Sequence, residues 1–214
     1  MMKVIKTSDG STTLYREDID ETYHSRHGAV QEALHVFIEN GLKKSTKNPL
    51  RIFEMGFGTG LNAFLTLQNA EKEVYYTGLE LYPIALEIIE QTEYWKTLNC
   101  SKDDFLKLHK LPWEEYADLS PKFHLRKMEG DLNDFDLDEQ FDLIYFDAFG
   151  PRVQGELWEK AILEKIVSRM NKEAIFVTYC AKGQVRRDLE ELGLKMDRLP
   201  GPPGKREMLF GKLV

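Results

Sequence analysis

Three acidic residues stand at or just after the ends of apolar runs that have the length of buried strands. Glu80 ends the run at 75–80, Asp131 follows a weaker run at 125–129, and Asp147 follows the run at 141–146. In open α/β sheets, ligands bind outside the carboxyl ends of the strands, which is where such residues fall. A carboxylate there can accept hydrogen bonds from hydroxyl or amino groups, and it can take up a proton. The pattern predicts a ligand site with acid–base chemistry along these strand ends.

A glycine-rich loop joins another apolar run to a helical pattern. Its sequence at 52–62 is Ile-Phe-Glu-Met-Gly-Phe-Gly-Thr-Gly-Leu-Asn. Glycine tolerates positive φ and lets the backbone approach a ligand closely. The spacing E-x-G-x-G-x-G differs from the dinucleotide fingerprint G-x-G-x-x-G and resembles the first motif of enzymes that use S-adenosylmethionine. The alternative is a loop without a ligand. The resemblance assigns to this cofactor Glu54, Gly56, Phe57, Gly58, Gly60 and Asn62.

The acids of the loop motif and of the strand ends receive separate roles. Glu54 suits the ammonium of the methionyl group, which NAD lacks, whereas Glu80, about 20 residues after the loop, suits the ribose hydroxyls of either nucleoside. In similar enzymes an acid at the position of Asp131 meets the adenine amino group, and the next residue, Leu132, flanks the ring. A solvated Glu80 and a turn or capping role for Asp131 are the alternatives.

Asp147 is the candidate catalytic residue. Beside an acceptor amine, its carboxylate can orient the amine and take up a proton, while Phe149 and Pro151 provide an apolar wall for a planar base. An adjacent carboxylate also favours the charged ammonium, which has no lone pair, so the site must desolvate the amine or accept its proton during attack. Capping of the next segment is the alternative role. No metal is expected, because Cys100, Cys180 and the histidines lack metal-site spacing.

The elements that must position these residues alternate between strands and helices, which predicts a mostly parallel sheet. Strands are expected at 51–55, 74–79, 141–146 and 174–179, and helices at about 60–71, 83–95, 155–170 and 181–192, with Pro83 in a first turn and Gly193 as a C-cap. The runs at 194–199 and 207–214 are joined too closely for a parallel crossover and predict an antiparallel hairpin. This α/β pattern is that of a class I S-adenosylmethionine-dependent methyltransferase with a Rossmann-like fold.

One domain is expected over 1–214, in which 50–214 form the core. Residues 1–45 provide a hairpin, with strands at 4–7 and 12–15, and a helix at 28–41. Residues 97–125 form a mostly polar insertion with short helical pieces at best. The chain has no run of about 20 apolar residues for a membrane helix and no signal-peptide core, which predicts a cytoplasmic protein with no membrane partner.

The net charge of −7 argues against non-specific binding to nucleic acid, which depends on neutralising phosphates. Residues 181–214, however, contain eight basic and five acidic residues, a local charge of +3. This basic end is either a footprint for a polyanion or an ordinary solvated surface.

Three groups of segments resemble one family, the methyltransferase part of the bacterial MnmC proteins and their free-standing MnmD type. They are residues 24–38, the glycine loop together with Asp147-Ala148-Phe149-Gly150-Pro151, and Val185-Arg186-Arg187 with Gly204-Lys205-Arg206-Glu207-Met208. The match covers roughly residues 10–212. The stretch from Phe149 to Arg152 departs from the Ala-Pro-rich version of the fused enzymes, which puts the packing of the acceptor loop in doubt.

The resemblance implies methylation of 5-aminomethyl(-2-thio)uridine at the tRNA wobble position to the 5-methylaminomethyl form, without the flavin-dependent oxidase activity. Aromatic and basic groups near the acceptor would stack on a uracil and hold phosphates. Ordinary packing or an exposed hairpin tip is the alternative for most of these positions. The residues that the resemblance places around the acceptor are Tyr23, His24, Ser25, Arg26, Phe149, Lys205, Arg206 and Glu207.

Three other functions remain open at this point. A small-molecule amine methyltransferase or an aminopropyltransferase-like enzyme would share the fold and an acid near Asp147. An NAD-dependent oxidoreductase would place its third glycine differently, and a non-catalytic RNA-binding protein would not need Glu54, Glu80 and Asp147 together. The oligomeric state, the tRNA species and the need for a 2-thio group are not determined by the sequence.

Overall fold

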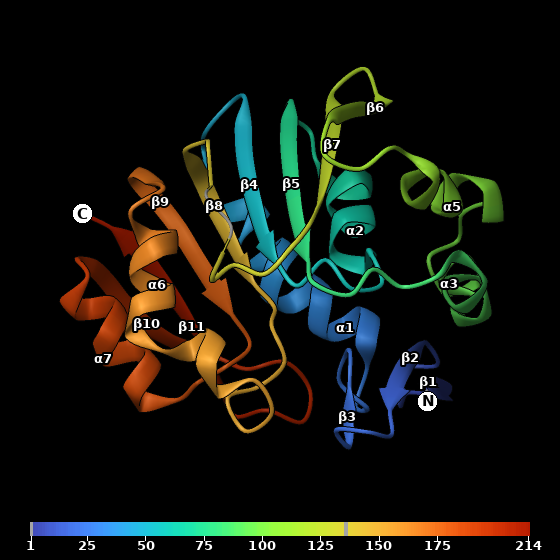
Figure 1. The fold of residues 1–214 in the computed structure, drawn as a ribbon, viewed down its shortest axis with the longest axis horizontal. Helices are drawn as coiled ribbons and strands as arrows, with labels where there is room; N and C mark the ends of the chain where they lie inside the picture. The colour runs from blue at the N-terminus through green and yellow to red at the C-terminus, as the bar shows by residue number, and fades with distance from the viewer. Residues whose placement is uncertain (1, 135–136) are drawn as a thin grey trace.

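The computed structural model describes residues 2–134 and 137–214. Its centre is an eight-stranded sheet with the strand order β10-β11-β9-β8-β4-β5-β7-β6 (Figure 1). The five middle strands are parallel, and β6, β10 and β11 run antiparallel to their neighbours. The predicted fold class and the C-terminal hairpin are therefore confirmed. The strands are β4 (Leu50–Met55), β5 (Val74–Glu80), β6 (Tyr116–Ser120), β7 (Phe123–Glu129), β8 (Phe141–Phe146), β9 (Met170–Thr178), β10 (Leu194–Pro200) and β11 (Glu207–Leu213).

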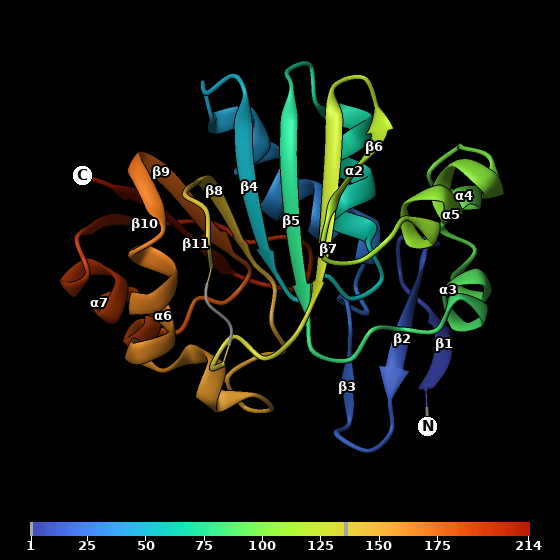
Figure 2. The ribbon, with the colours of Figure 1, turned by 45° about the horizontal axis from the view of Figure 1, so that its top comes forward.

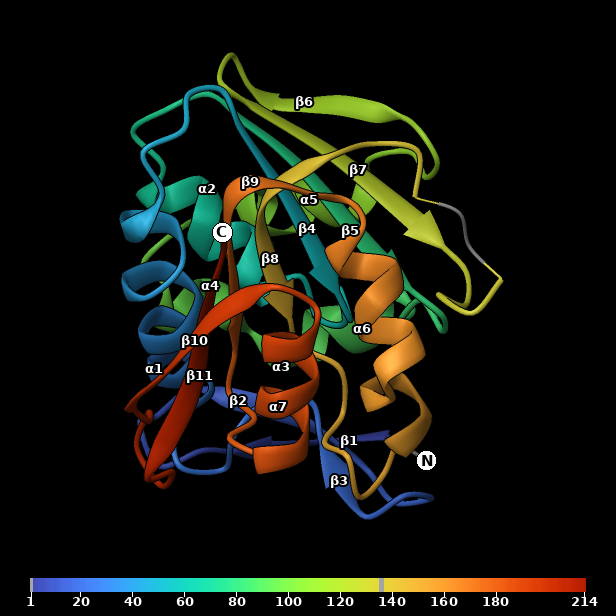
Figure 3. The same ribbon diagram turned by 90° about the vertical axis from the view of Figure 1, so that its left-hand side faces the viewer.

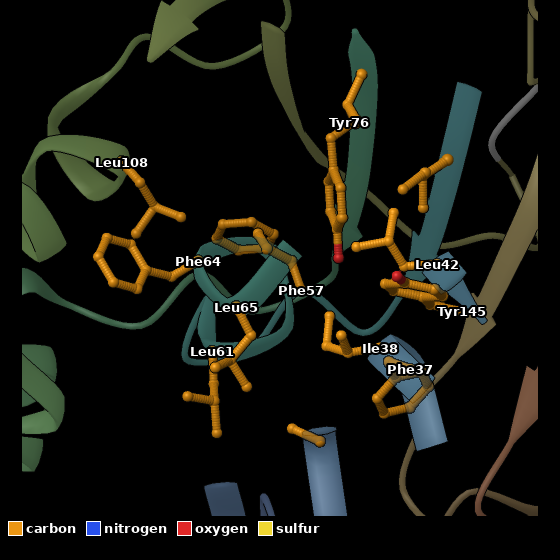
Figure 4. Close-up of a cluster of buried hydrophobic side chains, with 14 of the residues drawn as sticks. Phe37, Ile38, Leu42, Phe57, Leu61, Phe64, Leu65, Tyr76, Leu108 and Tyr145 are labelled. Atoms are coloured by element: carbon orange, nitrogen blue, oxygen red, sulfur yellow. The ribbon is translucent and has the colours of Figure 1, made fainter. Parts of the chain in front are cut away.

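Helices cover both faces of the sheet (Figure 3). One face carries α1 (Ala29–Ala33), which continues as the π-helix η1 (Leu34–Glu39), and α2 (Leu61–Asn69). The other face carries α6 (Lys160–Val167) and α7 (Gly183–Glu191). Strand residues alternate between the two layers, so that Ile52 packs in the first apolar cluster and Phe53 in the second. Figure 4 shows the first cluster, in which the rings of Tyr76 and Tyr145 pack edge to face with centroids 6.0 Å apart.

A small N-terminal sheet lies at the carboxyl ends of the central strands (Figure 2). Strands β1 (Met2–Lys6) and β2 (Thr12–Arg16) form the predicted hairpin, in which Ile5 pairs with Thr13. The short strand β3 (Glu21–Thr22) adds a third, unpredicted strand to β2. The following helix spans Ala29–Glu39 as α1 and η1, close to the predicted 28–41, and a 3₁₀ turn, η2 (Leu42–Lys44), comes next.

Two predicted helices are divided in the structure. The helix expected at 83–95 begins only at α3 (Leu86–Thr92), so Pro83 lies in the preceding loop and its predicted first-turn position is wrong. Glu93, at φ +50°, separates α3 from α4 (Tyr94–Thr97). The helix expected at 155–170 consists of the 3₁₀ turn η3 (Gly155–Trp158) followed by α6. Gly193, at φ +97°, follows α7 as expected of a C-terminal glycine.

The insertion at 97–125 is more ordered than predicted. It contains the nine-residue helix α5 (Lys102–Lys110) and the edge strand β6, so the expectation of short helical pieces at best is wrong. Ser101 caps α5 by accepting a hydrogen bond from the Asp104 N–H at 3.0 Å. Acidic residues in the first turn and basic ones in the last complement the helix dipole, while Phe105 and Leu108 are buried. Across the residues that the structure describes, no helix is long and apolar enough to span a membrane.

Candidate functional site

The strand order changes direction between β4 and β8. From β4 the chain proceeds to β5 and β7 on one side, whereas β8 and β9 lie on the other. Such a switch point is where open α/β sheets bind ligands. The loops after β4 and β8 meet here, because the Asp147 N–H donates to the Met55 carbonyl at 2.9 Å. Gly56 has φ +88°, and a Cβ on it would lie 2.8 Å from the Asp147 carbonyl oxygen, so glycine is required.

A cavity of about 800 Å³, including its open mouth, lies at this switch point; we call it the inner cavity. Its size is within the range of small-molecule sites. Six residues predicted to bind cofactor or to act in catalysis contribute to its wall: Gly56, Gly58, Glu80, Asp131, Leu132 and Asp147. Residues that the sequence analysis did not assign complete much of the wall, including Arg16, Met55, Leu79, Tyr82, Gln154, Glu156 and Leu157.

Glu80 and Asp131 both line the inner cavity, but their carboxylates accept hydrogen bonds from different groups. The Glu80 carboxylate accepts hydrogen bonds from the N–H groups of Gly58 at 2.8 Å and Tyr82 at 3.0 Å. Burial raises the pKa of Glu80 above its ordinary value, and these backbone donors oppose the shift. Asp131 accepts hydrogen bonds from the Asn133 backbone at 2.8 Å and its side-chain amide at 2.9 Å. It therefore has the turn role considered as an alternative and also lines the cavity.

Four predicted cofactor residues lie behind the wall and do not line the cavity. Glu54 is fully buried; its oxygens accept hydrogen bonds from the Tyr76 hydroxyl and the Asn62 amide, both at 2.8 Å. The same Asn62 amide donates to Asp147 Oδ2 at 2.7 Å. The Phe57 ring fills the space above Gly78. The structure thus uses these residues to shape and anchor the loop; those behind the wall are Glu54, Phe57, Gly60 and Asn62.

Asp147 has an unusual electrostatic setting. Burial is the main cause that raises its pKa well above the ordinary value, and the Glu32 carboxylate raises the pKa further. The Asn62 hydrogen bond and the Lys205 ammonium act in the opposite direction on the pKa of Asp147. The pKa of Glu54 is also raised, first by burial and then by the charge of Asp147. Ionisation of both carboxyl groups is therefore disfavoured relative to an exposed acid.

A second hollow adjoins the inner cavity, and we call it the outer cavity. Tyr23, His24, Ala148 and Phe149 line both, so these residues form the partition between them. The rings of Tyr23 and Phe149 pack edge to face with centroids 5.0 Å apart. Five of its lining residues come from the predicted acceptor set beyond Phe149, namely Tyr23, His24, Ser25, Arg26 and Lys205.

His24 is a neutral group in this partition. One ring nitrogen, Nε2, lies 2.9 Å from the Thr59 hydroxyl of the glycine loop. Burial lowers the pKa of His24 to about 4, an effect that Glu32 opposes. The imidazole is therefore uncharged at neutral pH and holds the N-terminal segment against the loop.

An ion pair that the sequence analysis missed closes the outer cavity. Lys205 Nζ donates to Glu32 Oε2 at 2.5 Å and lies 3.7 Å from the centroid of the Tyr179 ring. Glu32 also accepts the Ser25 N–H at 3.0 Å, and the Tyr179 hydroxyl donates to the Ala148 carbonyl at 2.8 Å. Two signals were available: Glu32 is an acid beside the apolar face of a helix, and Tyr179 directly follows a strand.

Arg206 and Glu207 lie outside the outer cavity. Together with Lys205, Tyr179, Cys180 and Ala181, they line a neighbouring shallow hollow. Glu207 accepts a hydrogen bond from the Arg198 guanidinium at 3.1 Å, and Arg206 is exposed. Of the three hairpin residues predicted to border the acceptor, Lys205 therefore lines the cavity itself.

The arrangement places two cavities on either side of one partition, and Asp147 lines the inner cavity directly before the partition residues Ala148 and Phe149. The inner cavity offers glycine backbone, the Glu80 carboxylate and apolar side chains, and the outer cavity offers an aromatic pair and charged groups. A transfer between two ligands held on the two sides of this partition is the chemistry that this geometry favours. Within residues 2–134 and 137–214, no group of three His, Cys, Asp or Glu side chains is arranged to hold a metal ion.

The sequence is similar to those of known methyltransferases and of proteins that contain a related part. A family model described as S-adenosyl-L-methionine-dependent methyltransferase matches residues 104–213. The tRNA 5-methylaminomethyl-2-thiouridine biosynthesis bifunctional protein MnmC of Leptospira borgpetersenii serovar Hardjo-bovis (strain JB197) is 30% identical over 210 residues, which cover 90% of this chain and 32% of that protein. Its counterpart in Leptospira interrogans serovar copenhageni is 30% identical over 223 residues, which cover 96% of this chain and 34% of that protein. The chain thus spans about a third of the length of these relatives.

Solved structures are similar as well. The crystal structure of MNMC2 from Aquifex aeolicus has a TM-score of 0.77 and 26% identity, and the match covers 100% of this chain and 70% of that one. Spermidine synthase from Thermotoga maritima has a TM-score of 0.59 at 11% identity, and the match covers 99% of this chain and 68% of that one. The second similarity extends to the fold alone.

Proposed function

The chain belongs to a family of S-adenosyl-L-methionine-dependent methyltransferases and is related to the methyltransferase part of MnmC, and on this basis we propose that it methylates 5-aminomethyl(-2-thio)uridine at the tRNA wobble position. The product would be 5-methylaminomethyl(-2-thio)uridine. The observation that carries the proposal is that two cavities share a partition containing Tyr23 and Phe149, and that Asp147 lines the inner cavity beside this partition.

The inner cavity fits S-adenosylmethionine. Its wall combines the backbone of Gly56 and Gly58 with the carboxylate of Glu80, which is assigned to the ribose hydroxyls. Asp131 and Leu132 line the same cavity, and we assign them to the adenine amino group and ring. Glu54 and Asn62 support the loop from behind. When bound, S-adenosylmethionine supplies a methyl group on a positively charged sulfur.

Asp147 performs the acid–base part of the proposed reaction. An alkylammonium must lose a proton before its nitrogen can attack, and the proposed acceptor is the carboxylate of Asp147, which lines the inner cavity beside the partition. The raised pKa of Asp147 reduces the pKa difference between the carboxyl group and the amine, which makes this proton transfer less unfavourable. The Asn62 amide fixes the carboxylate, so the protein contributes mainly orientation, proximity and a place for the proton.

We propose methyl transfer alone for this chain, without the flavin-dependent oxidation step. Because tRNA is found in the cytoplasm, we also propose that the protein acts there. A polyamine substrate, as in the aminopropyltransferase-like alternative, is supported only by the fold that the chain shares with spermidine synthase. The edge-to-face pair of Tyr23 and Phe149 suits a planar base better than an unbranched polyamine.

The test is incubation of the protein with S-adenosylmethionine and tRNA that carries 5-aminomethyluridine, followed by nucleoside mass spectrometry. The expected result is a gain of one methyl group on that nucleoside and no gain on unmodified uridine. A parallel reaction contains putrescine and spermidine without tRNA. Methylation of the polyamines with unchanged tRNA nucleosides would contradict the proposal and favour the alternative.

A further inference from the structure

We propose that a continuous basic track leads from the outer cavity across the β10–β11 turn to the start of α7 and binds the phosphate backbone of RNA. The track comprises Arg26, Lys182, Arg187, Arg198, Lys205 and Arg206. It rests on the proposed function, since it specifies the surface that would hold the tRNA while one base enters the outer cavity.

The first part of the track joins the outer cavity to the hairpin turn. Arg26 and Lys205 both line the outer cavity, from the N-terminal segment and the turn respectively. The two segments are in contact, because the His27 ring occupies the space beside Gly204, whose φ is +83°. Lys205 and Arg206 then line the shallow hollow together with Ala181. The basic surface therefore passes from the cavity mouth to the segment that precedes α7.

The second part lies at the beginning of α7. Lys182 directly precedes this helix. A Cβ at Gly183 would lie 3.4 Å from Arg187 Nη1 and 3.8 Å from Arg198 Nη2, so guanidinium groups from α7 and β10 converge on this residue. Three basic side chains from two elements thus extend the surface that starts at the outer cavity.

The charge of this track is only partly compensated. Within the part of the chain that the structure describes, the ion pairs of the track are Lys205 with buried Glu32 and Arg198 with Glu207. Arg187 donates to the neutral Gln184 at 2.7 Å, and Arg206 is exposed. By contrast, Lys160 pairs with Glu191 and Lys212 with Glu173. An excess of positive charge on a protein of net charge −7 is therefore concentrated beside the acceptor site.

RNA is the polyanion that suits both the basic residues of the track and the aromatic partition at its end. Arginine and lysine hold phosphates without regard to sequence, and bases in single-stranded loops turn outward to stack on aromatic side chains. The track ends at the partition that contains Tyr23 and Phe149. A loop whose base enters that cavity would have its flanking phosphates near Lys205 and Arg206. An acidic peptide would use the charges but not the aromatic partition.

The test compares two charge-matched double variants with the wild-type protein. Arg187→Gln with Arg206→Gln removes two charges from the track. Lys195→Gln with Lys212→Gln removes two charges from the β10–β11 hairpin. These two residues lie opposite each other on the two strands, away from the turn. Binding of a fluorescent anticodon stem-loop RNA is measured by anisotropy over a range of KCl concentrations, and S-adenosylmethionine binding is measured separately by calorimetry.

The track variant is expected to bind the RNA about tenfold more weakly in moderate salt, with a salt slope lower by roughly 1.4 to 1.8, because two phosphate contacts are lost. The hairpin control should keep the wild-type affinity within about twofold, and S-adenosylmethionine binding should not change in either variant. Equal RNA affinity and salt slope in wild type and track variant would overturn the proposal. So would an equal loss in the control, which would indicate net charge alone.

The methyl-transfer reaction separates this proposal from the proposed function. If wild-type protein methylates the tRNA but the track variant keeps the wild-type KM, the track is wrong and the function stands. If the RNA binds through the track but receives no methyl group, the function is wrong and the surface stands.

Discussion

Asn62 links the two carboxyl groups on which the site depends. Its side-chain amide donates to Glu54 behind the cavity wall and to Asp147 on the wall. This double contact fixes the position of Asp147 while burial raises the pKa of both acids. The catalytic carboxylate is therefore held by a buried polar network, where each member depends on its partners.

Replacement of Asp147 by Asn tests its acid–base role with little change in shape. Asp147→Asn retains an oxygen that can accept the Asn62 hydrogen bond but cannot take up a proton. We expect kcat for methyl transfer to fall by about 10²- to 10⁴-fold, while the Kd of S-adenosylmethionine changes by less than a few-fold. Glu156→Gln is the matched control, since Glu156 is an exposed acid on the same cavity. Turnover near wild type in Asp147→Asn would remove this residue from the chemistry.

The charges of Glu32 and Lys205 act on Asp147 in opposite directions and predict opposite shifts of the pH profile. A base must be ionised, so kcat falls as pH decreases through the pKa of Asp147, and burial places this fall above the usual range of an aspartate. Glu32 raises the pKa of Asp147 and Lys205 lowers it. Glu32→Gln should therefore move the acidic limb to lower pH, and Lys205→Met should move it to higher pH. Profiles that shift in the same direction, or not at all, would contradict this assignment.

The glycine loop can be tested with two glycines of nearly equal φ. Gly56 has φ +88° and would place a Cβ 2.8 Å from the Asp147 carbonyl, whereas Gly10 has φ +84° and open space around it. Gly10→Ala should cost about 1 to 2 kcal/mol of unfolding free energy from its backbone conformation alone. Gly56→Ala should cost more and should abolish S-adenosylmethionine binding. Urea denaturation and calorimetry measure both effects, and equal costs would show that the close approach of the two loops is unimportant.

The insertion that carries α5 supports the glycine loop through a buried lysine. Lys127 on β7 is 1% exposed, donates to the His109 carbonyl at 2.7 Å and lies 4.8 Å from the Trp113 ring centroid. The Phe57 ring contacts both His109 and Trp113. Burial lowers the pKa of Lys127 to about 8. The insertion is thus part of the support of the site.

This lysine makes stability depend on alkaline pH. Between about pH 8 and 10.5 the unfolded chain binds the Lys127 proton more than the folded chain does, so the free energy of unfolding rises with pH across this window. The contribution is present above the unfolded pKa and is lost as pH falls through the folded pKa. Relative to Lys127→Met, wild-type protein should gain on the order of 1 kcal/mol per pH unit there. A constant difference between the two proteins in denaturant titrations would refute this assignment.

The central strands, both hairpins and the switch-point site follow from the sequence because apolar runs, glycine turns and strand-end acids are local signals. The side-chain directions behind the loop do not follow from a motif match. Glu54 is in the loop motif, yet strand alternation places it on the same side as buried Ile52. The sequence analysis missed helix α5 because most of its residues are charged, although Phe105 on its apolar face packs on Phe64. Glu32 and Lys205 are 173 residues apart, so only the tertiary structure reveals their pairing.

The molecule as a whole places one cavity on each side of a single partition. The inner cavity lies at the strand ends, and the outer cavity lies between the N-terminal segment and the C-terminal hairpin. The N-terminal segment lines both cavities, and the C-terminal hairpin contributes Lys205 to the outer one. The account depends on these two cavities holding the two reactants.

A crystal structure with S-adenosylmethionine and an anticodon stem-loop that carries 5-aminomethyluridine, using the Asp147→Asn protein, tests this most directly. We expect the ribose hydroxyls on Glu80, the uracil in the outer cavity, and the amine nitrogen between residue 147 and the donor methyl carbon. A cofactor bound away from the inner cavity, or a base bound outside the partition of Tyr23 and Phe149, would contradict the account.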